Sequence, residues 1–295
     1  MSHRFELARI LLYISMFKIH QNSFLSRVPA IIRSSIFLVS LPIILFCDTA
    51  WAVDLGTALD YAVLASSAVT NTGPTTINGD LGVWPGTSFT GSESMTINGT
   101  VHLTDADAQQ AQSDLTAAYN TIVGLSFDFD LSGQDLGTVG TLFPGVYRFS
   151  SSAQLTGALT LDAQGNDDAQ FFFQVGSALT TASGSSVLLL NGSEGDDVFW
   201  QVGNSATLGA TTLFQGNILA LTSITLNTGA QIGCGRALAR NGAVTLDSNT
   251  ISSVCDDDDG GNGGGGSAVP EPNSLLLVGF GMSMLAAFKT RFVKK

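Results

Sequence analysis

The segment Phe172-Phe173-Gln174-Val175-Gly176 recurs 27 residues later as Phe199-Trp200-Gln201-Val202-Gly203. A shorter repeat, Thr76-Ile77-Asn78-Gly79, recurs 20 residues later as Thr96-Ile97-Asn98-Gly99. Between such segments the chain consists of short, uncharged runs separated by turn-forming residues, which favours an all-β protein. A repeat in fixed register favours a β-solenoid over a β-sandwich, because each coil of a solenoid stacks on an equivalent coil.

Many of these runs hold a lone threonine between apolar residues, as in Leu159-Thr160-Leu161 and Ile224-Thr225-Leu226. Side chains alternate along a strand, so the apolar neighbours enter the core and the threonine points outward. Stacked coils would then raise a column of threonines on one face. Counting by twos gives eight candidate residues for this outward surface: Thr156, Thr160, Thr180, Thr207, Thr225, Asn227, Thr245 and Asn249. The sequence leaves open which of three solenoid faces carries them.

Residues 104–123 break the strand pattern, because alanine, leucine and other apolar residues recur there at helical spacing. Thr104 is placed to cap the amino end, Asp105 and Asp107 fall in the first turn, and Gly124 ends the segment. The sequence therefore predicts one amphipathic helix that lies along a flank of the solenoid.

Residues 1–52 have the pattern of a secretory signal peptide. Two arginines precede an apolar run, and Ala50-Trp51-Ala52 supplies the small residues of a cleavage site. We therefore expect an exported protein whose folded domain covers residues 53–254. In an oxidising compartment, the pair Cys234 and Cys255 is most simply a disulfide.

The C-terminal part of the chain has the composition of a linker followed by a sorting signal. Residues 255–268 are rich in aspartate and glycine. In residues 269–295, the motif Val269-Pro270-Glu271-Pro272 precedes a short apolar stretch and four basic residues. This order resembles the PEP-CTERM sorting signal of Gram-negative bacteria. The resemblance implies export through the inner membrane, transient membrane insertion by a C-terminal helix, processing by an exosortase, and delivery to the cell surface or extracellular matrix. An ordinary single-pass tail anchor is the alternative for this segment.

Charge and side-chain chemistry exclude several classes of function. Residues 53–268 hold 21 acidic and three basic residues, which argues against nucleic acid as a partner. His102 is the sole histidine there and no nucleophile–base pair is visible, so we expect no enzyme. The two cysteines lack further partners, so we expect no metal site and no cofactor. The acidic pairs Asp167-Asp168 and Asp196-Asp197 fall in matching turns one coil apart, where they could bind calcium, but aspartates in turns are far more often turn formers.

Several motifs in sequence order resemble the DUF3494 family of microbial ice-binding proteins. They include Leu55-Gly56-Thr57-Ala58, Gly79-Asp80-Leu81-Gly82, Pro144-Gly145-Val146-Tyr147 and the stretch from Gly235 to Leu246, and they cover almost all of residues 54–254. The resemblance implies a discontinuous right-handed β-solenoid of triangular cross-section with one long α-helix packed alongside. It also implies that a flat threonine-rich face binds ice crystals and inhibits ice growth and recrystallisation. A non-catalytic matrix or adhesive surface protein without ice activity is the alternative.

Overall fold

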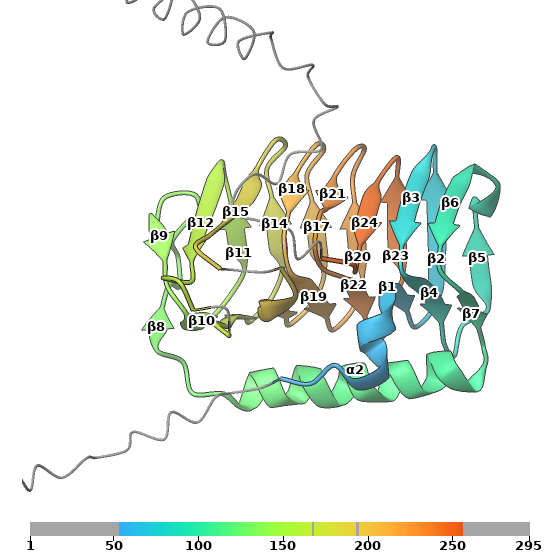
Figure 1. The fold of residues 1–295 in the computed structure, drawn as a ribbon, viewed down its shortest axis with the longest axis horizontal. Helices are drawn as coiled ribbons and strands as arrows, with labels where there is room; N and C mark the ends of the chain where they lie inside the picture. The colour runs from blue at the N-terminus through green and yellow to red at the C-terminus, as the bar shows by residue number, and fades with distance from the viewer. Residues whose placement is uncertain (1–52, 167, 193–194, 256–295) are drawn as a thin grey trace, which may run out of the picture. The chain divides into compact units, whose positions relative to one another are not determined.

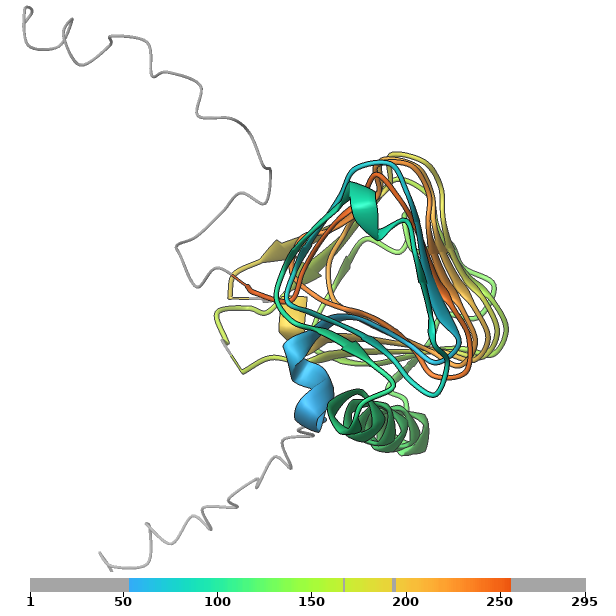
Figure 2. The same ribbon diagram turned by 90° about the vertical axis from the view of Figure 1, so that its right-hand side faces the viewer.

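The computed structural model describes residues 53–166, 168–192 and 195–255, which form a stack of coils beside a long helix (Figure 1). The strands belong to three sheets, and the strand pairs within each sheet are parallel. Seen along the stack, the three sheets form three sides around a common core (Figure 2). The prediction of an all-β protein built from stacked coils with one accompanying helix is confirmed.

Each sheet follows the long axis of the stack, and neighbours in the lists below are paired. Sheet 1 comprises β7 (Val101–Leu103), β4 (Asp80–Val83), β1 (Tyr61–Ala65), β22 (Ala237–Ala239), β19 (Asn217–Ala220), β16 (Val198–Val202), β13 (Phe171–Val175), β10 (Gly145–Phe149) and β8 (Phe129–Asp130). Sheet 2 comprises β11 (Ala153–Leu155), β14 (Leu179–Thr181), β17 (Ala206–Leu208), β20 (Ile224–Leu226), β23 (Val244–Asp247), β2 (Ala68–Thr72) and β5 (Ser88–Thr90). Sheet 3 comprises β6 (Met95–Asn98), β3 (Thr75–Asn78), β24 (Thr250–Ser252), β21 (Gln231–Ile232), β18 (Leu213–Phe214), β15 (Ser186–Leu190), β12 (Ala158–Asp162) and β9 (Thr141–Leu142). Three short 3-10 helices complete the described elements: η1 (Gly56–Asp60), η2 (Ser92–Ser94) and η3 (Gly195–Asp197).

The 27-residue repeat stacks one coil on the next in register. Phe172 pairs with Phe199 and Phe173 pairs with Trp200 across β13 and β16. The inward rings of Phe173 and Trp200 stack with centroids 3.9 Å apart and an interplanar angle of 7°. Both side chains are fully buried, so this repeat builds the aromatic part of the core.

The order of the coils in space differs from their order in the chain. In sheet 1, β1 lies between β22 and β4, so the first coil of the chain stacks on the last. Sheets 2 and 3 repeat this arrangement, because β2 pairs with β23 and β3 pairs with β24. The stack is therefore discontinuous, with the early coils at one end and β8 and β9 at the other (Figure 1).

Helix α2 (Ala106–Gly124) carries the chain from the early coils at one end of the stack to β8 at the other (Figure 1). Its 19 residues span about 28 Å, and the eight strand steps from β7 to β8 span about 38 Å. Leu115 and Ile122 of the helix are fully buried in a second cluster with Phe172 and Phe199. Burying each such side chain stabilises the fold by about 1.5–3 kcal/mol, so the helix is firmly held against the outer side of sheet 1.

Polar contacts fix the position of α2 on sheet 1. Gln201 Nε2 donates to the hydroxyl of Tyr119 over 2.8 Å, and both side chains are buried. Asp114 accepts hydrogen bonds from the amide of Thr57, over 2.9 Å, and from its hydroxyl, over 2.7 Å. Burial acts to raise the pKa of Asp114, but the hydrogen bonds from Thr57 and Gln110 outweigh it and lower the pKa below its usual value.

The helix begins later than predicted, because Asp105 rather than Thr104 caps it. Asp105 Oδ1 accepts a hydrogen bond from the amide of Ala108 over 2.9 Å. Thr104 instead adopts a positive φ of 57° and donates its hydroxyl to the carbonyl of Leu103. Aspartate is a better amino cap than threonine, and a left-handed residue before it reverses the chain out of β7.

Two further features concern the ends of the described chain. Cys234 and Cys255 form a disulfide with their Cα atoms 5.0 Å apart, which ties the segment after β24 to the segment after β21. No helix within residues 53–255, apart from 167 and 193–194, is long and apolar enough to cross a membrane. The predicted signal peptide, the sorting signal and most of the linker fall on residues 1–52 and 256–295, outside the described part.

Candidate functional site

A continuous column of threonines runs along the outer surface of sheet 2. The pairing places outward-facing residues of seven neighbouring strands in one row: Gln154, Thr180, Thr207, Thr225, Thr245, Thr70 and Thr90. We call the six threonines of this row the threonine column, and Gln154 ends the row at β11. Six successive coils thus present the same side chain at the same place.

The flanking residues of each strand explain why these threonines face outward. Ile224 and Leu226 on either side of Thr225 are buried, as are Val244 and Leu246 on either side of Thr245. With both neighbours in the core, the strand holds the threonine on the outside. Its β-branched side chain has little rotamer freedom, so the orientation of the methyl and hydroxyl groups is fixed.

A second outward row of small residues lies beside the threonine column. It occupies the position two residues earlier in each coil and comprises Ser152, Ala178, Ser205, Ser223, Ala243, Ala68 and Ser88. Serine hydroxyls of this row accept hydrogen bonds from the next coil, for example Ser223 Oγ from the amide of Ala243 over 3.3 Å. Small side chains keep the surface flat, and these bonds keep it rigid.

The hydroxyls of the column remain available to solvent. Thr70 donates to Thr245 over 3.3 Å. The hydroxyls of Thr180, Thr207 and Thr225 make no hydrogen bond to another residue of the described chain. The surface can therefore bond to ordered water through donors and acceptors that the protein itself does not use.

The eight residues predicted from the sequence do not share one surface. Thr180, Thr207, Thr225 and Thr245 lie together in the column. Thr160 belongs to β12 of sheet 3, where it pairs with Thr141 and Leu188. The prediction that Thr160 shares a surface with the other threonines is wrong. The chain turns a corner after β11, and alternation along a strand does not indicate that the following strand lies on another face.

The prediction that Asn249 points outward is also wrong. Asn249 is only 2% exposed, and its side chain turns into the corner between sheets 2 and 3. Its amide Nδ2 donates to the carbonyls of Asn227, over 3.0 Å, and Ala230, over 2.9 Å. Unpaired carbonyls at a buried corner are costly, so the amide is held inside to satisfy them.

Thr156 and Asn227 lie at the rim of sheet 2, two positions beyond the column in their coils. Both are exposed. The amide of Thr156 donates to Asp135 over 2.9 Å. Burial acts to raise the pKa of Asp135, but hydrogen bonds from Thr156 and Gly137 outweigh it and lower the pKa. The rim is thereby anchored at the β11 end of the sheet.

Thr70 and Thr90 are members of the column that counting along the chain missed. They belong to the early coils, whose position beside the last coils is set by the discontinuous stacking. A sequence pattern could have identified both threonines. Ala68 and Ser88 precede them by two positions, just as a small residue precedes each of the later threonines by two positions.

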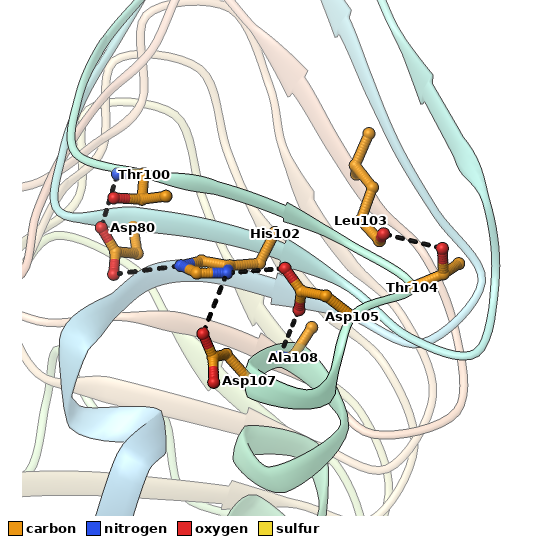
Figure 3. A network of polar contacts seen from close by, with 8 residues as sticks. All are labelled: Asp80, Thr100, His102, Leu103, Thr104, Asp105, Asp107 and Ala108. Atoms are coloured by element: carbon orange, nitrogen blue, oxygen red, sulfur yellow. Dashed lines mark hydrogen bonds and ion pairs between the residues drawn. The ribbon is translucent and has the colours of Figure 1, made fainter.

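His102 lies among three carboxylates at the end of the stack, as Figure 3 shows. Its Nδ1 lies 2.8 Å from Asp105 and 3.7 Å from Asp107, and its Nε2 lies 3.8 Å from Asp80. The amide of Ala108 and then His102 lower the pKa of Asp105, so its charge is favoured. These contacts join β7 to the amino end of α2, and no group of three or more His, Cys, Asp or Glu side chains within the described residues is suited to hold a metal ion.

Residues 63–252 match the family described as Ice-binding-like. The chain belongs to this family. An ice-binding protein of Nostoc sp. (strain HG1) is 54% identical over 242 residues, which cover 81% of this chain and 88% of the relative. An ice-binding protein of Flavobacterium frigoris (strain PS1) is 34% identical over 218 residues, covering 68% of this chain and 76% of the relative.

Solved structures of the family have the same fold. The crystal structure of an ice-binding protein from an Antarctic biological consortium matches with a TM-score of 0.66 and 47% identity, over 68% of this chain and 90% of that one. The ice-binding protein of the Antarctic ascomycete Antarctomyces psychrotrophicus matches with a TM-score of 0.66 and 40% identity, over 68% of this chain and 97% of that one. The resemblance to ice-binding proteins read from the sequence motifs is confirmed.

Proposed function

We propose that this protein binds ice crystals through the outer surface of sheet 2, and that it inhibits ice growth and recrystallisation outside the cell. The observation that carries the proposal is the threonine column, six coils long and in register. The names of the relatives support it, because each of those proteins is an ice-binding protein. We expect neither catalysis nor a cofactor.

The physical basis of recognition is a rigid grid of small polar and apolar groups. Neighbouring coils repeat at about 4.8 Å and alternate residues of a strand at about 6.7 Å, which is comparable to oxygen spacings in ice planes. Each threonine methyl orders the water around it, and each hydroxyl anchors that water. Because the side chains are already fixed by the buried core beneath them, little conformational entropy is lost when ice is bound.

Sheet 2 is favoured over the other two sides of the stack. The outer side of sheet 1 is covered by α2. On sheet 3 the large exposed side chains of Leu188 and Leu213 interrupt the surface. We therefore propose an ice-binding set formed by the threonine column with two rim residues: Thr70, Thr90, Thr180, Thr207, Thr225, Thr245, Thr156 and Asn227.

The test replaces one threonine in the middle of the column with a bulky residue. Thr225→Tyr should abolish most of the thermal hysteresis and the faceting of ice crystals, because the ring holds the surface away from the ice. Thr160→Tyr on sheet 3 is the matched control and should leave both intact. A folded wild-type protein without any effect on ice growth would refute the proposal and favour a matrix or adhesive role, in which glycans or cells are bound equally well above freezing.

The proposal includes the export signal, the sorting signal, the domain bounds and the coil geometry expected from the sequence. We propose cleavage of a signal peptide after Ala52, a domain over 53–254, a linker over 255–268, and exosortase processing of 269–295, whose sorting motif is Val269-Pro270-Glu271-Pro272. Under this scheme the C-terminal segment inserts transiently in the membrane of a Gram-negative bacterium. The three sheets, one on each side of the coil, support the expected triangular cross-section, and we propose that the coils are right-handed.

A further inference from the structure

The Thr-Ile-Asn-Gly repeat has no part in the threonine column, yet the structure stacks its two copies in register. Thr76 pairs with Thr96 and Asn78 with Asn98 across β3 and β6 of sheet 3. On the other side of β3, Thr250 pairs with Thr76 and Ser252 with Asn78. Three adjacent coils therefore carry the same pattern, a threonine followed two positions later by a small polar residue.

The pattern faces outward. Ile77 and Ile251, between the two polar rows, are fully buried. Thr96, Thr250 and Asn98 are exposed, and the remaining members are half-buried. The six residues form two parallel rows that we call the Thr-Asn array: Thr76, Thr96, Thr250, Asn78, Asn98 and Ser252. None of its side chains is charged.

Internal hydrogen bonds account for only one of the two rows. Asn98 Nδ2 donates to Asn78 Oδ1 over 2.8 Å, which is a bond that stabilises the stack. The hydroxyls of Thr76, Thr96 and Thr250 make no hydrogen bond to another described residue. The amide row therefore has a structural role, whereas the hydroxyls of the threonine row stabilise no other described residue. The threonine row has the same side-chain chemistry and the same spacing between coils as the threonine column.

The array shares its coils with part of the threonine column and is rigidly joined to it. At the corner between sheets 2 and 3, Asn71 Nδ2 donates to the carbonyls of Gly73, over 2.9 Å, and Gly91, over 3.1 Å. Thr75 donates its hydroxyl to Asn71 over 2.6 Å and accepts the amide of Asn249 over 3.1 Å. The threonine column and the Thr-Asn array therefore lie on two sides of the same coils, in a fixed relative orientation (Figure 2).

We propose that the Thr-Asn array is a second ice-contacting surface, and that a molecule adsorbed through sheet 2 uses it to contact a second ice surface at a grain boundary. The proposal rests on the proposed function and extends it. One rigid face cannot lie flat on two differently oriented crystals, whereas two faces on one rigid body can contact both. The array should therefore contribute to inhibition of recrystallisation, which occurs between grains, and not to hysteresis measured on a single crystal.

The test uses the whole protein carrying Thr76→Tyr and Thr96→Tyr together, with Thr160→Tyr on the same sheet as the matched control. We expect the concentration that halves recrystallisation to rise about tenfold in the double variant, equivalent to about 1.4 kcal/mol. Single-crystal hysteresis and the melting temperature should stay at the wild-type values. The control should match the wild type in all three measurements.

Three outcomes would overturn the proposal. Unchanged recrystallisation in the folded double variant would show that the array does not contact ice. An equal fall in recrystallisation activity and hysteresis would show a single contact surface instead of two. If the tyrosine variant does not fold, Thr76→Ser with Thr96→Ser removes only methyl groups, and wild-type recrystallisation activity in that variant would also refute it. Failure of the proposed function is distinguishable, because the wild type would then lack hysteresis altogether.

Discussion

Replacement of Asn249 by alanine should destabilise the protein without removing a group from the proposed ice-contacting surface. The side chain accepts a hydrogen bond from the amide of Asp247 over 2.6 Å and donates two to the carbonyls of Asn227 and Ala230. Each such bond contributes about 1 kcal/mol net, so the loss of three predicts about 3 kcal/mol. In a domain of this size that corresponds to a fall in Tm of about 6–12 °C.

The assay is thermal and denaturant unfolding of the oxidised protein, with Asn227→Ala as the control. The side chain of Asn227 is exposed two positions beyond Thr225, and its removal should change the free energy of unfolding by less than about 0.5 kcal/mol. Hysteresis of the folded Asn249→Ala protein should remain close to wild type. Equal stability of the two variants, or a loss of hysteresis in Asn249→Ala at temperatures where it is folded, would refute the assignment of Asn249 to a buried corner.

Three further predictions concern the fold that supports the surface. Reduction of the Cys234–Cys255 disulfide, whose cysteines are 21 residues apart, should lower the free energy of unfolding by about 3 kcal/mol, measured by denaturant titration with and without reductant. Gln201→Leu leaves the buried hydroxyl of Tyr119 with a single 3.4 Å bond to a carbonyl and should lower the free energy of unfolding by about 1–3 kcal/mol, measured by denaturant titration. Because the folded-state pKa of Asp114 is lowered, its ionised carboxylate contributes to the free energy of unfolding above about pH 4, and this contribution is lost as the pH falls through the folded-state pKa. In Asp114→Asn, the free energy of unfolding should therefore fall less steeply with decreasing pH below that value, as measured by unfolding curves at a series of pH values.

Much of the fold could be predicted because the sequence repeats. The segments around Phe172 and Phe199 differ in one large ring yet keep the same alternation, and they pair residue for residue. The helix was predictable for the same kind of reason, since its buried positions recur at helical spacing. Its start was misplaced by one capping residue, because Thr104 and Asp105 are both cap formers and the left-handed turn at Thr104 selects the second.

The site was only partly predictable, and the reason is geometric. Alternation along a strand predicts whether a side chain points into the core or outward. It does not show where the chain turns a corner into the next sheet, so Thr160 and Asn249 were assigned to a surface they do not occupy. The column also depends on pairs distant in the chain. Thr70 and Thr245 are 175 residues apart and neighbours in space, and local patterns carry no direct information about that pairing.

The stacking of the first coil on the last constrains when the protein can fold during synthesis. Strand β1 lies between β22 and β4, so one of its two pairing partners emerges only when residues 237–239 have been made. Until then the apolar edge of the first coil has no neighbour, although the coils between β10 and β19 can already assemble on one another. Such long sequence separations slow folding, so the N-terminal coils are the part of the nascent chain that most needs protection from aggregation. The same pairing stabilises the finished stack, because separating the first coil from the last requires breaking strand pairs in all three sheets at once.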